Sequence, residues 1–105
     1  MKTIYKYTMD LIRNKSENDI WELKIPQMSK IIKIKMLKPN VITFWVQIEK
    51  DWLTSPYQKV KIKVAGTGHD IPENDYIYFY IDSVFDPQRT LVWHVYHAQP
   101  KQGPG

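Results

Sequence analysis

Three histidines, at positions 69, 94 and 97, are the side chains best suited to proton transfer or metal binding in this sequence. His94 and His97 belong to segment 91–97, where a period of two places them on opposite faces of a strand, so they cannot chelate one ion together. Zinc needs three or four converging ligands, and the sequence has no cysteine. We therefore expect no metal site and no thiolate chemistry, and we expect His94 to form a hydrogen bond beside Tyr96.

Residues for acid–base or nucleophilic catalysis are equally sparse. Asp82 and Asp86 near Arg89 could form an acid pair with a cation, but segment 83–89 is typical of a strand end followed by a turn, where Asp before Pro is common. No serine is set against a histidine and an acid in a specific pattern. We predict no catalytic residues, no cofactor and no enzymatic activity.

The segment richest in glycine is 65–75. In Gly66-Thr67-Gly68 the backbone N–H groups could converge into an anion-binding nest, beside which His69 could recognise a ligand. The segment lacks the Gly-Lys-Ser/Thr of a phosphate loop and opens no helix, which excludes a dinucleotide fingerprint. The alternative is a long hairpin loop whose glycines supply positive φ and whose histidine forms a local hydrogen bond.

The two strands predicted on either side of this loop carry the most informative surface chemistry. If segments 58–65 and 76–83 pair through the loop, three lysines lie beside three tyrosines on one outward face: Lys59, Lys61, Lys63, Tyr76, Tyr78 and Tyr80. Trp45 could join them if Phe44, Val46 and Ile48 face inward. Such a face could stack bases and neutralise phosphates, form the centre of a protein interface, or be a solvated face with lysine stems over the rings.

Nearly every part of the chain has the period of two that is typical of strands. Segment 59–64 alternates lysine with aliphatic residues, segment 32–36 does the same with Ile32, Ile34 and Met36 inward, and segment 76–82 alternates Tyr with Ile or Phe. Further strands are expected at 2–9, 19–25, 41–49 and 90–97, with Pro, Gly and Asn between them. These seven short strands predict an all-β fold, either an antiparallel β-sandwich or a small open barrel.

Composition limits the class of protein. The chain has 105 residues, 43% hydrophobic, 25% charged and 13% aromatic, with a formal net charge of +4. These values exclude a disordered chain, a coiled coil and a disulfide-stapled module. We expect one domain over residues 1–98 and a loose tail over 99–105. No apolar run approaches the ~20 residues of a membrane span, and the start does not resemble a signal peptide, so a cytoplasmic location is expected.

Three motifs resemble a family of small, mostly uncharacterised phage and prophage proteins. They are MKTIYKY at 1–7, GTGHDIP at 66–72 and LVWHVY at 91–96. The resemblance implies a viral context, the cytoplasm of a host cell and action by binding, often to blunt host immunity. The family supplies no catalytic residues, and segment 10–60 carries no part of the match.

Together these features favour a non-enzymatic phage accessory protein that antagonises a host defence by binding, as a homo-oligomer and without a membrane. In its sharpest form it sequesters an anionic, nucleotide-type immune signal. The candidate ligand-binding residues are Gly66, Thr67, Gly68 and His69 at the phosphates, Tyr76, Tyr78 and Tyr80 at the base, and Lys61, Lys63, Arg89 and His94 around them. The alternatives are a protein-surface inhibitor of a host defence complex, similar to an anti-CRISPR protein, a single-stranded nucleic-acid-binding protein and a virion component.

Overall fold

The computed structural model describes residues 2–14, 16–17, 19–49, 56–71 and 75–101. Within them the chain forms seven strands, which confirms the seven that periodicity predicts. Their bounds are β1 Lys2–Asp10, β2 Ile20–Pro26, β3 Lys30–Lys38, β4 Val41–Glu49, β5 Tyr57–Gly66, β6 Tyr76–Phe85 and β7 Val92–Pro100.

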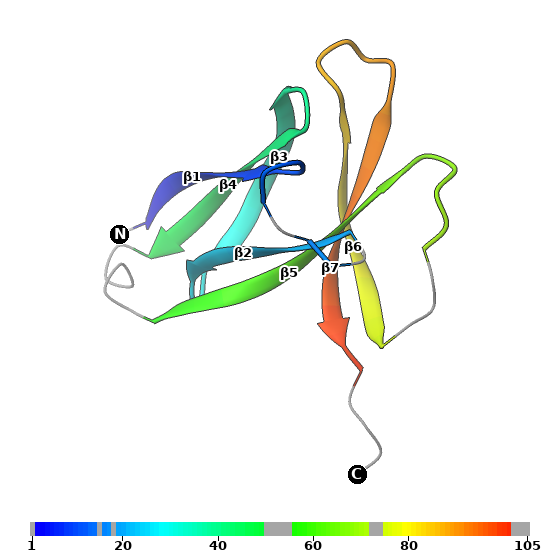
Figure 1. The fold of residues 1–105 in the computed structure, drawn as a ribbon. Helices are drawn as coiled ribbons and strands as arrows, with labels where there is room; N and C mark the ends of the chain where they lie inside the picture. The colour runs from blue at the N-terminus through cyan, green and yellow to red at the C-terminus, as the bar shows by residue number, and fades with distance from the viewer. Residues whose placement is uncertain (1, 15, 18, 50–55, 72–74, 102–105) are drawn as a thin grey trace.

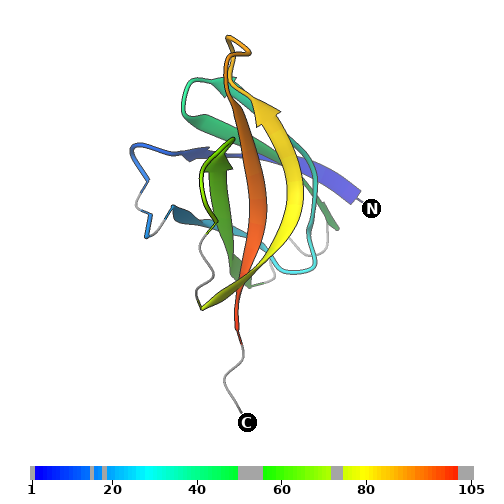
Figure 2. The same cartoon turned by 90° about the vertical axis from the view of Figure 1, so that its right-hand side faces the viewer.

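The strands form two antiparallel sheets (Figure 1). Sheet A has the order β1-β4-β3, and sheet B has the order β2-β5-β7-β6. The sheets do not close into a barrel, and no helix occurs among the described residues. This architecture confirms the all-β class and is compatible with a β-sandwich. Figure 2 shows β6 and β7 as a long curved ribbon that continues into their connecting hairpin at the top of the view.

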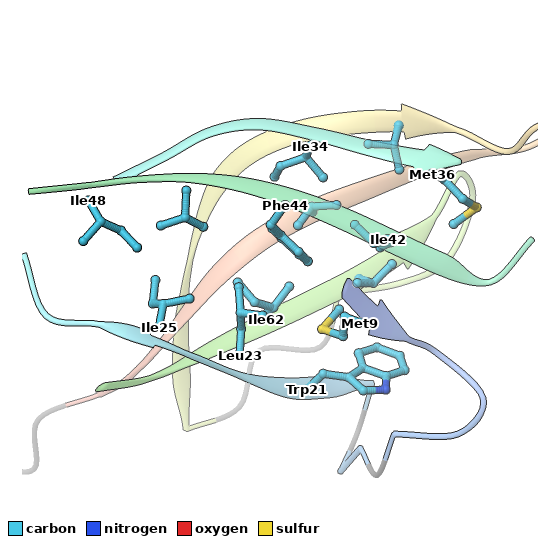
Figure 3. Packing of buried hydrophobic residues seen from close by; sticks show 14 residues of the cluster. Met9, Trp21, Leu23, Ile25, Ile34, Met36, Ile42, Phe44, Ile48 and Ile62 are labelled. Carbon is cyan, nitrogen blue, oxygen red and sulfur yellow. The ribbon is translucent and has the colours of Figure 1, made fainter. Parts of the chain in front are cut away.

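The core lies between the two sheets, because alternate residues of each strand turn toward the opposite layer. Phe44, Val46 and Ile48 of the central strand β4 are completely buried, which meets the condition under which Trp45 faces outward. They pack with Leu23 and Ile62 from sheet B (Figure 3). Sheet A thus places its even-numbered β4 residues inward, and its odd-numbered β4 residues, Trp45 among them, face away from the core.

β3 departs from strict alternation at two positions. Its register against β4 shifts between Ile31 and Lys33, and again between Met36 and Lys38. The predicted inward position of Ile32 is therefore wrong: this residue is 44% exposed, and Ile31 packs against the core instead. A β-bulge adds one residue to one strand, and the alternation that a sequence pattern extrapolates is then displaced by one.

The predicted pairing of segments 58–65 and 76–83 is also wrong. β7 lies between β5 and β6 and forms hydrogen bonds with both. Because β5 and β6 are both antiparallel to β7, they run parallel to each other and cannot form a hairpin. Gly66 lies opposite Trp93 near the start of β7, whereas Tyr76 lies opposite Pro100 at its end. The lysine strand and the tyrosine strand are consequently two positions apart in sheet B.

The last strand extends beyond the predicted domain boundary at residue 98. Gln99 pairs with Ile77, Pro100 pairs with Tyr76, and the Lys101 amide donates to the Asp75 carbonyl at 2.7 Å. The rest of the predicted tail, 102–105, lies outside the described residues. In the part of the chain that the structure describes, no helix is long and apolar enough to cross a membrane.

Candidate binding face

The outer surface of sheet B brings the predicted lysines and tyrosines onto one side of the molecule. Cross-strand partners share a face, and the register joins Lys61 through Ala98 to Tyr78, and Lys63 through Tyr96 to Tyr80. We call this surface the tyrosine face; it comprises Lys59, Lys61, Lys63, Tyr76, Tyr78, Tyr80, Ser83, His94 and Tyr96. Sequence reasoning therefore assigned the correct side to the lysines and tyrosines although β7 separates their strands.

Four tyrosine rings form a continuous stripe on this face. The ring centroids of Tyr76 and Tyr78 are 6.4 Å apart, those of Tyr78 and Tyr96 are 6.4 Å apart, and those of Tyr80 and Tyr96 are 5.7 Å apart. The last two pairs meet edge to face, which is a favourable arrangement for aromatic rings. Tyr80 is 59% exposed, so the stripe ends on a ring that is open to a ligand.

The lysines at the other end of the face use their ammonium groups within the protein. Lys61 donates from Nζ to the Tyr76 hydroxyl at 3.0 Å and lies 5.2 Å from the centre of that ring. This hydrogen bond raises the pKa of Lys61. Lys63 is only 4% exposed and has a partner of its own, so it offers little charge at the surface.

A groove of about 660 Å³ adjoins Lys61 and Tyr76. Its volume falls in the range of small-molecule sites. Three carboxylates, those of Glu17, Glu22 and Asp75, line it together with the ammonium groups of Lys61 and Lys101. Carboxylates repel phosphate, so the anionic part of a ligand would be placed more favourably at the opposite end of the tyrosine face.

That opposite end carries a chain of hydrogen bonds centred on His94. The Tyr80 hydroxyl lies 2.6 Å from Ser83 Oγ, which lies 2.9 Å from His94 Nδ1. His94 Nε2 lies 3.0 Å from Thr67 Oγ1, whose hydroxyl donates to the Val92 carbonyl at 3.4 Å. Because that carbonyl only accepts, the chain is satisfied when His94 donates from Nε2 and accepts at Nδ1. The predicted hydrogen-bonding role of His94 is confirmed, with Ser83 and Thr67 as its partners.

The glycine-rich loop forms a tight turn. The His69 amide donates to the Gly66 carbonyl at 3.0 Å, and Gly68 has φ +88°, as the third position of a type II turn requires. The Gly66 amide donates to His69 Nδ1 at 3.2 Å, and the Thr67 amide donates to the Val92 carbonyl at 3.2 Å. Three of the N–H groups that a nest would offer to an anion are thus used within the protein, which favours the turn interpretation of this loop.

His69 and His94 lie on different sides of sheet B. The His69 ring packs over Gly66, where a Cβ would come within 3.0 Å of it, and meets Trp93 edge to face at 6.2 Å. Trp93 packs against the core, whereas His94 faces outward with Ser83. His69 consequently forms the local hydrogen bond of the alternative interpretation and does not share a cluster with His94.

Arg89 lies in the turn between β6 and β7, at the end of sheet B where the glycine-rich loop also lies (Figure 1). Asp86 organises this turn by accepting hydrogen bonds from the amides of Thr90 and Leu91 at 2.6 and 2.8 Å, and these bonds lower the pKa of its carboxyl group. The prediction that Asp86 serves turn formation is confirmed. Arg89 itself is exposed.

Two predicted candidates lie elsewhere. His97 points to the inner side of sheet B, between Ile62 and Phe79, so the prediction that it faces away from His94 is confirmed. Trp45 faces outward as expected, but from sheet A, and therefore does not join the tyrosine face. Among the described residues no group of three or more His, Cys, Asp or Glu could hold a metal ion.

Sequence reasoning missed Ser83 as a member of the face. Strict alternation from Tyr80 would place Asp82 outward, but the register against β7 shifts between Tyr80 and Asp82, and Ser83 becomes the partner of His94. Tyr96 could have been included, because the same period of two that places His94 outward also places Tyr96 there.

Fold and face define a two-sheet antiparallel β protein with an aromatic surface that ends in a hydroxyl–imidazole cluster. The chain belongs to the family described as Domain of unknown function (DUF7352), whose model matches residues 1–104. No curated protein and no solved structure matches the chain at a significant level.

Proposed function

We propose that the protein acts by binding, without catalysis, and that the tyrosine face takes an anionic nucleotide-type ligand. The observation that carries this proposal is the stripe of four tyrosine rings that ends beside His94, Ser83 and Thr67. Aromatic faces stack on nucleobases regardless of sequence. A phosphate near His94, Ser83 and Thr67 would take its hydrogen bonds by replacing an acceptor within the chain that these groups form with one another.

The geometry supports one orientation of such a ligand. The base would stack on Tyr80, the most exposed ring of the stripe. The phosphates would point toward Thr67, Ser83 and His94, with Arg89 supplying positive charge from the neighbouring turn. This orientation also keeps the phosphates away from the carboxylates that line the groove at Lys61.

The biological setting of the proposal rests on the resemblance of the three motifs to phage and prophage proteins. In that setting the protein would work in the cytoplasm of the host as a homo-oligomer, and it would sequester a nucleotide signal of a host defence system. Action by capture fits a protein in which we predict no catalytic residues.

Calorimetric titration tests the proposal. Cyclic dinucleotides, cyclic trinucleotides and ADP-ribose derivatives are titrated into the protein and into the variants Tyr80→Leu and Tyr80→Phe. We expect heat with at least one ligand, a loss of about tenfold or more in affinity for Tyr80→Leu because stacking is removed, and near-normal affinity for Tyr80→Phe because the ring is kept. Absence of heat with every ligand would contradict the nucleotide proposal.

A protein-surface inhibitor is the second candidate, because the edge strand β6 exposes apolar side chains on both of its faces. Tyr80 on one face is 59% exposed, and Ile77 and Phe79 on the other are 47% and 49% exposed. Aromatic residues of this kind often form the centre of protein interfaces. Pull-down from a host lysate separates the candidates: recovery of a defined host protein that Tyr78→Ala and Phe79→Ala abolish would favour this function.

A further inference from the structure

The outer surface of sheet A is a second face with a different chemistry. The register of β1, β4 and β3 places six lysines on the side away from the core; we call it the lysine face, and it comprises Lys2, Lys6, Lys30, Lys33, Lys35 and Lys38. All six are exposed. Each strand has nine residues and therefore spans about 30 Å, so the six ammonium groups are spread over a long surface.

The lysine face carries an excess of positive charge. The only acidic residues in the same registers are Asp10 and Glu49, at opposite ends of the sheet. The chain has fifteen Lys and Arg and eleven Asp and Glu, so nine of each sign remain for all other positions. The six lysines and two carboxylates give the lysine face a formal charge of +4, equal to the formal net charge of the whole chain.

The lysines of this face are not neutralised by neighbours. Asp10 turns its carboxylate to its own loop, where Oδ1 accepts from the amides of Ile12 and Arg13, both at 2.9 Å. No ion pair joins any of the six lysines to another residue within the described part of the chain, whereas Lys59 on sheet B is 3.9 Å from Glu22. Such a field attracts a polyanion.

An aromatic ring lies between the lysines of this face. Trp45 on the central strand pairs with Lys6 on one side and with Lys33 on the other. Lys33 Nζ lies 5.3 Å from the centre of the Trp45 ring, and the ring is half-buried. Proteins bind single-stranded nucleic acid by combining basic side chains with aromatic rings. The ammonium groups contact successive phosphates, and the ring stacks on a base.

We propose that the lysine face binds single-stranded nucleic acid through its phosphodiester backbone, with Trp45 as the stacking platform. The binding is without strong sequence preference, because neither lysine nor a stacked indole reads the edge of a base. The proposal shares no residue with the tyrosine face and therefore stands or falls independently of the proposed function.

The test compares two double variants that remove the same charge from different parts of the molecule. Lys33→Gln with Lys35→Gln alters the lysine face, and Lys24→Gln with Lys101→Gln removes two exposed lysines, on β2 and just after β7, that belong to neither face. Binding of a fluorescein-labelled oligothymidylate is followed by anisotropy over a series of salt concentrations, after circular dichroism has shown that both variants are folded.

We expect the first pair to lower affinity about tenfold and the second pair to leave it within about twofold. For single-stranded nucleic acid, each phosphate contact contributes about −0.7 to the slope of log K against log[salt]. Loss of two lysines in the first double variant should therefore reduce the magnitude of this slope by about 1.4. Trp45→Leu should weaken binding about tenfold without changing the slope, and Trp45→Phe should recover most of the loss.

Three results would overturn the proposal. One is the absence of oligonucleotide binding by the unaltered protein at low ionic strength. Another is an equal loss of affinity in the two double variants, since general charge attraction rather than this face would then explain the binding. The third is binding of phosphatidylserine vesicles without binding of the oligonucleotide, which would make a lipid surface the partner.

Discussion

At the scale of single residues, a backbone irregularity decides which side chains meet on the tyrosine face. The bulge between Tyr80 and Asp82 turns Ser83 outward, and only for that reason does its hydroxyl reach His94. Residue type and alternation predicted the tyrosines and His94 correctly because these residues precede the bulge or lie on the regular strand β7. Neither rule predicts where a strand gains one residue, so Ser83 was not identified.

Gly68 is required for its backbone conformation rather than for space. Its φ is +88°, and a Cβ added there would have no atom within 4 Å. We predict that Gly68→Ala lowers the free energy of unfolding by about 1 kcal/mol, because a residue with a Cβ is strained at positive φ. Gly68→Asn should cost less, because Asn tolerates this region better. Urea denaturation measures both, and equal costs for the two variants would contradict the explanation.

Because His97 is partly buried, we predict that the free energy of unfolding changes between neutral and mildly acidic pH. Burial lowers the pKa of His97, so the unfolded chain takes up a proton near pH 6.5 while the folded protein still resists it. The free energy of unfolding is therefore highest above about pH 6.5 and decreases as the pH falls toward the lowered value in the folded state. Urea denaturation at pH 7.5 and 5.5 should show a smaller decrease for His97→Gln than for the unaltered protein. An identical decrease would assign the effect to other groups.

At the scale of elements, alternation and turn residues predicted all seven strands, because each strand buries one face and ends at Pro, Gly or Asn. The order of the strands could not be predicted in the same way. Whether β5 pairs with β6 or with β7 depends on contacts between residues far apart in the chain, and no local pattern reports these. The lysine face was missed for the same reason: its lysines come from β1 and β3, which meet only across β4.

The position of a strand in its sheet should determine how much a core substitution costs. Phe44 on the central strand β4 is completely buried, and Phe79 on the edge strand β6 is 49% exposed. We predict that Phe44→Ala lowers the free energy of unfolding by about 3–5 kcal/mol, the usual cost of a cavity at a buried phenylalanine. Phe79→Ala should cost much less, because solvent already reaches its ring. Comparable losses in chemical denaturation would show that Phe79 is covered in solution, for example by a second copy of the chain.

At the scale of the whole molecule, the two sheets turn two unlike surfaces outward. Sheet B presents tyrosine rings and hydroxyl groups beside lysines that have partners within the protein, and sheet A presents six exposed lysines around one indole ring. The two proposals therefore assign anionic partners of different kinds to opposite sides of the molecule. The DUF7352 family model matches residues 1–104 and therefore includes the residues of both faces.

The proposed capture of a nucleotide signal is tested most directly by mass spectrometry of small molecules that co-purify with the protein from phage-infected cells. The unaltered protein is compared with Tyr80→Leu and with Tyr80→Phe. We predict a nucleotide-type ion that accompanies the unaltered protein and Tyr80→Phe and is depleted with Tyr80→Leu. No such ion in any sample, or equal amounts with all three proteins, would contradict binding of a nucleotide at the tyrosine face.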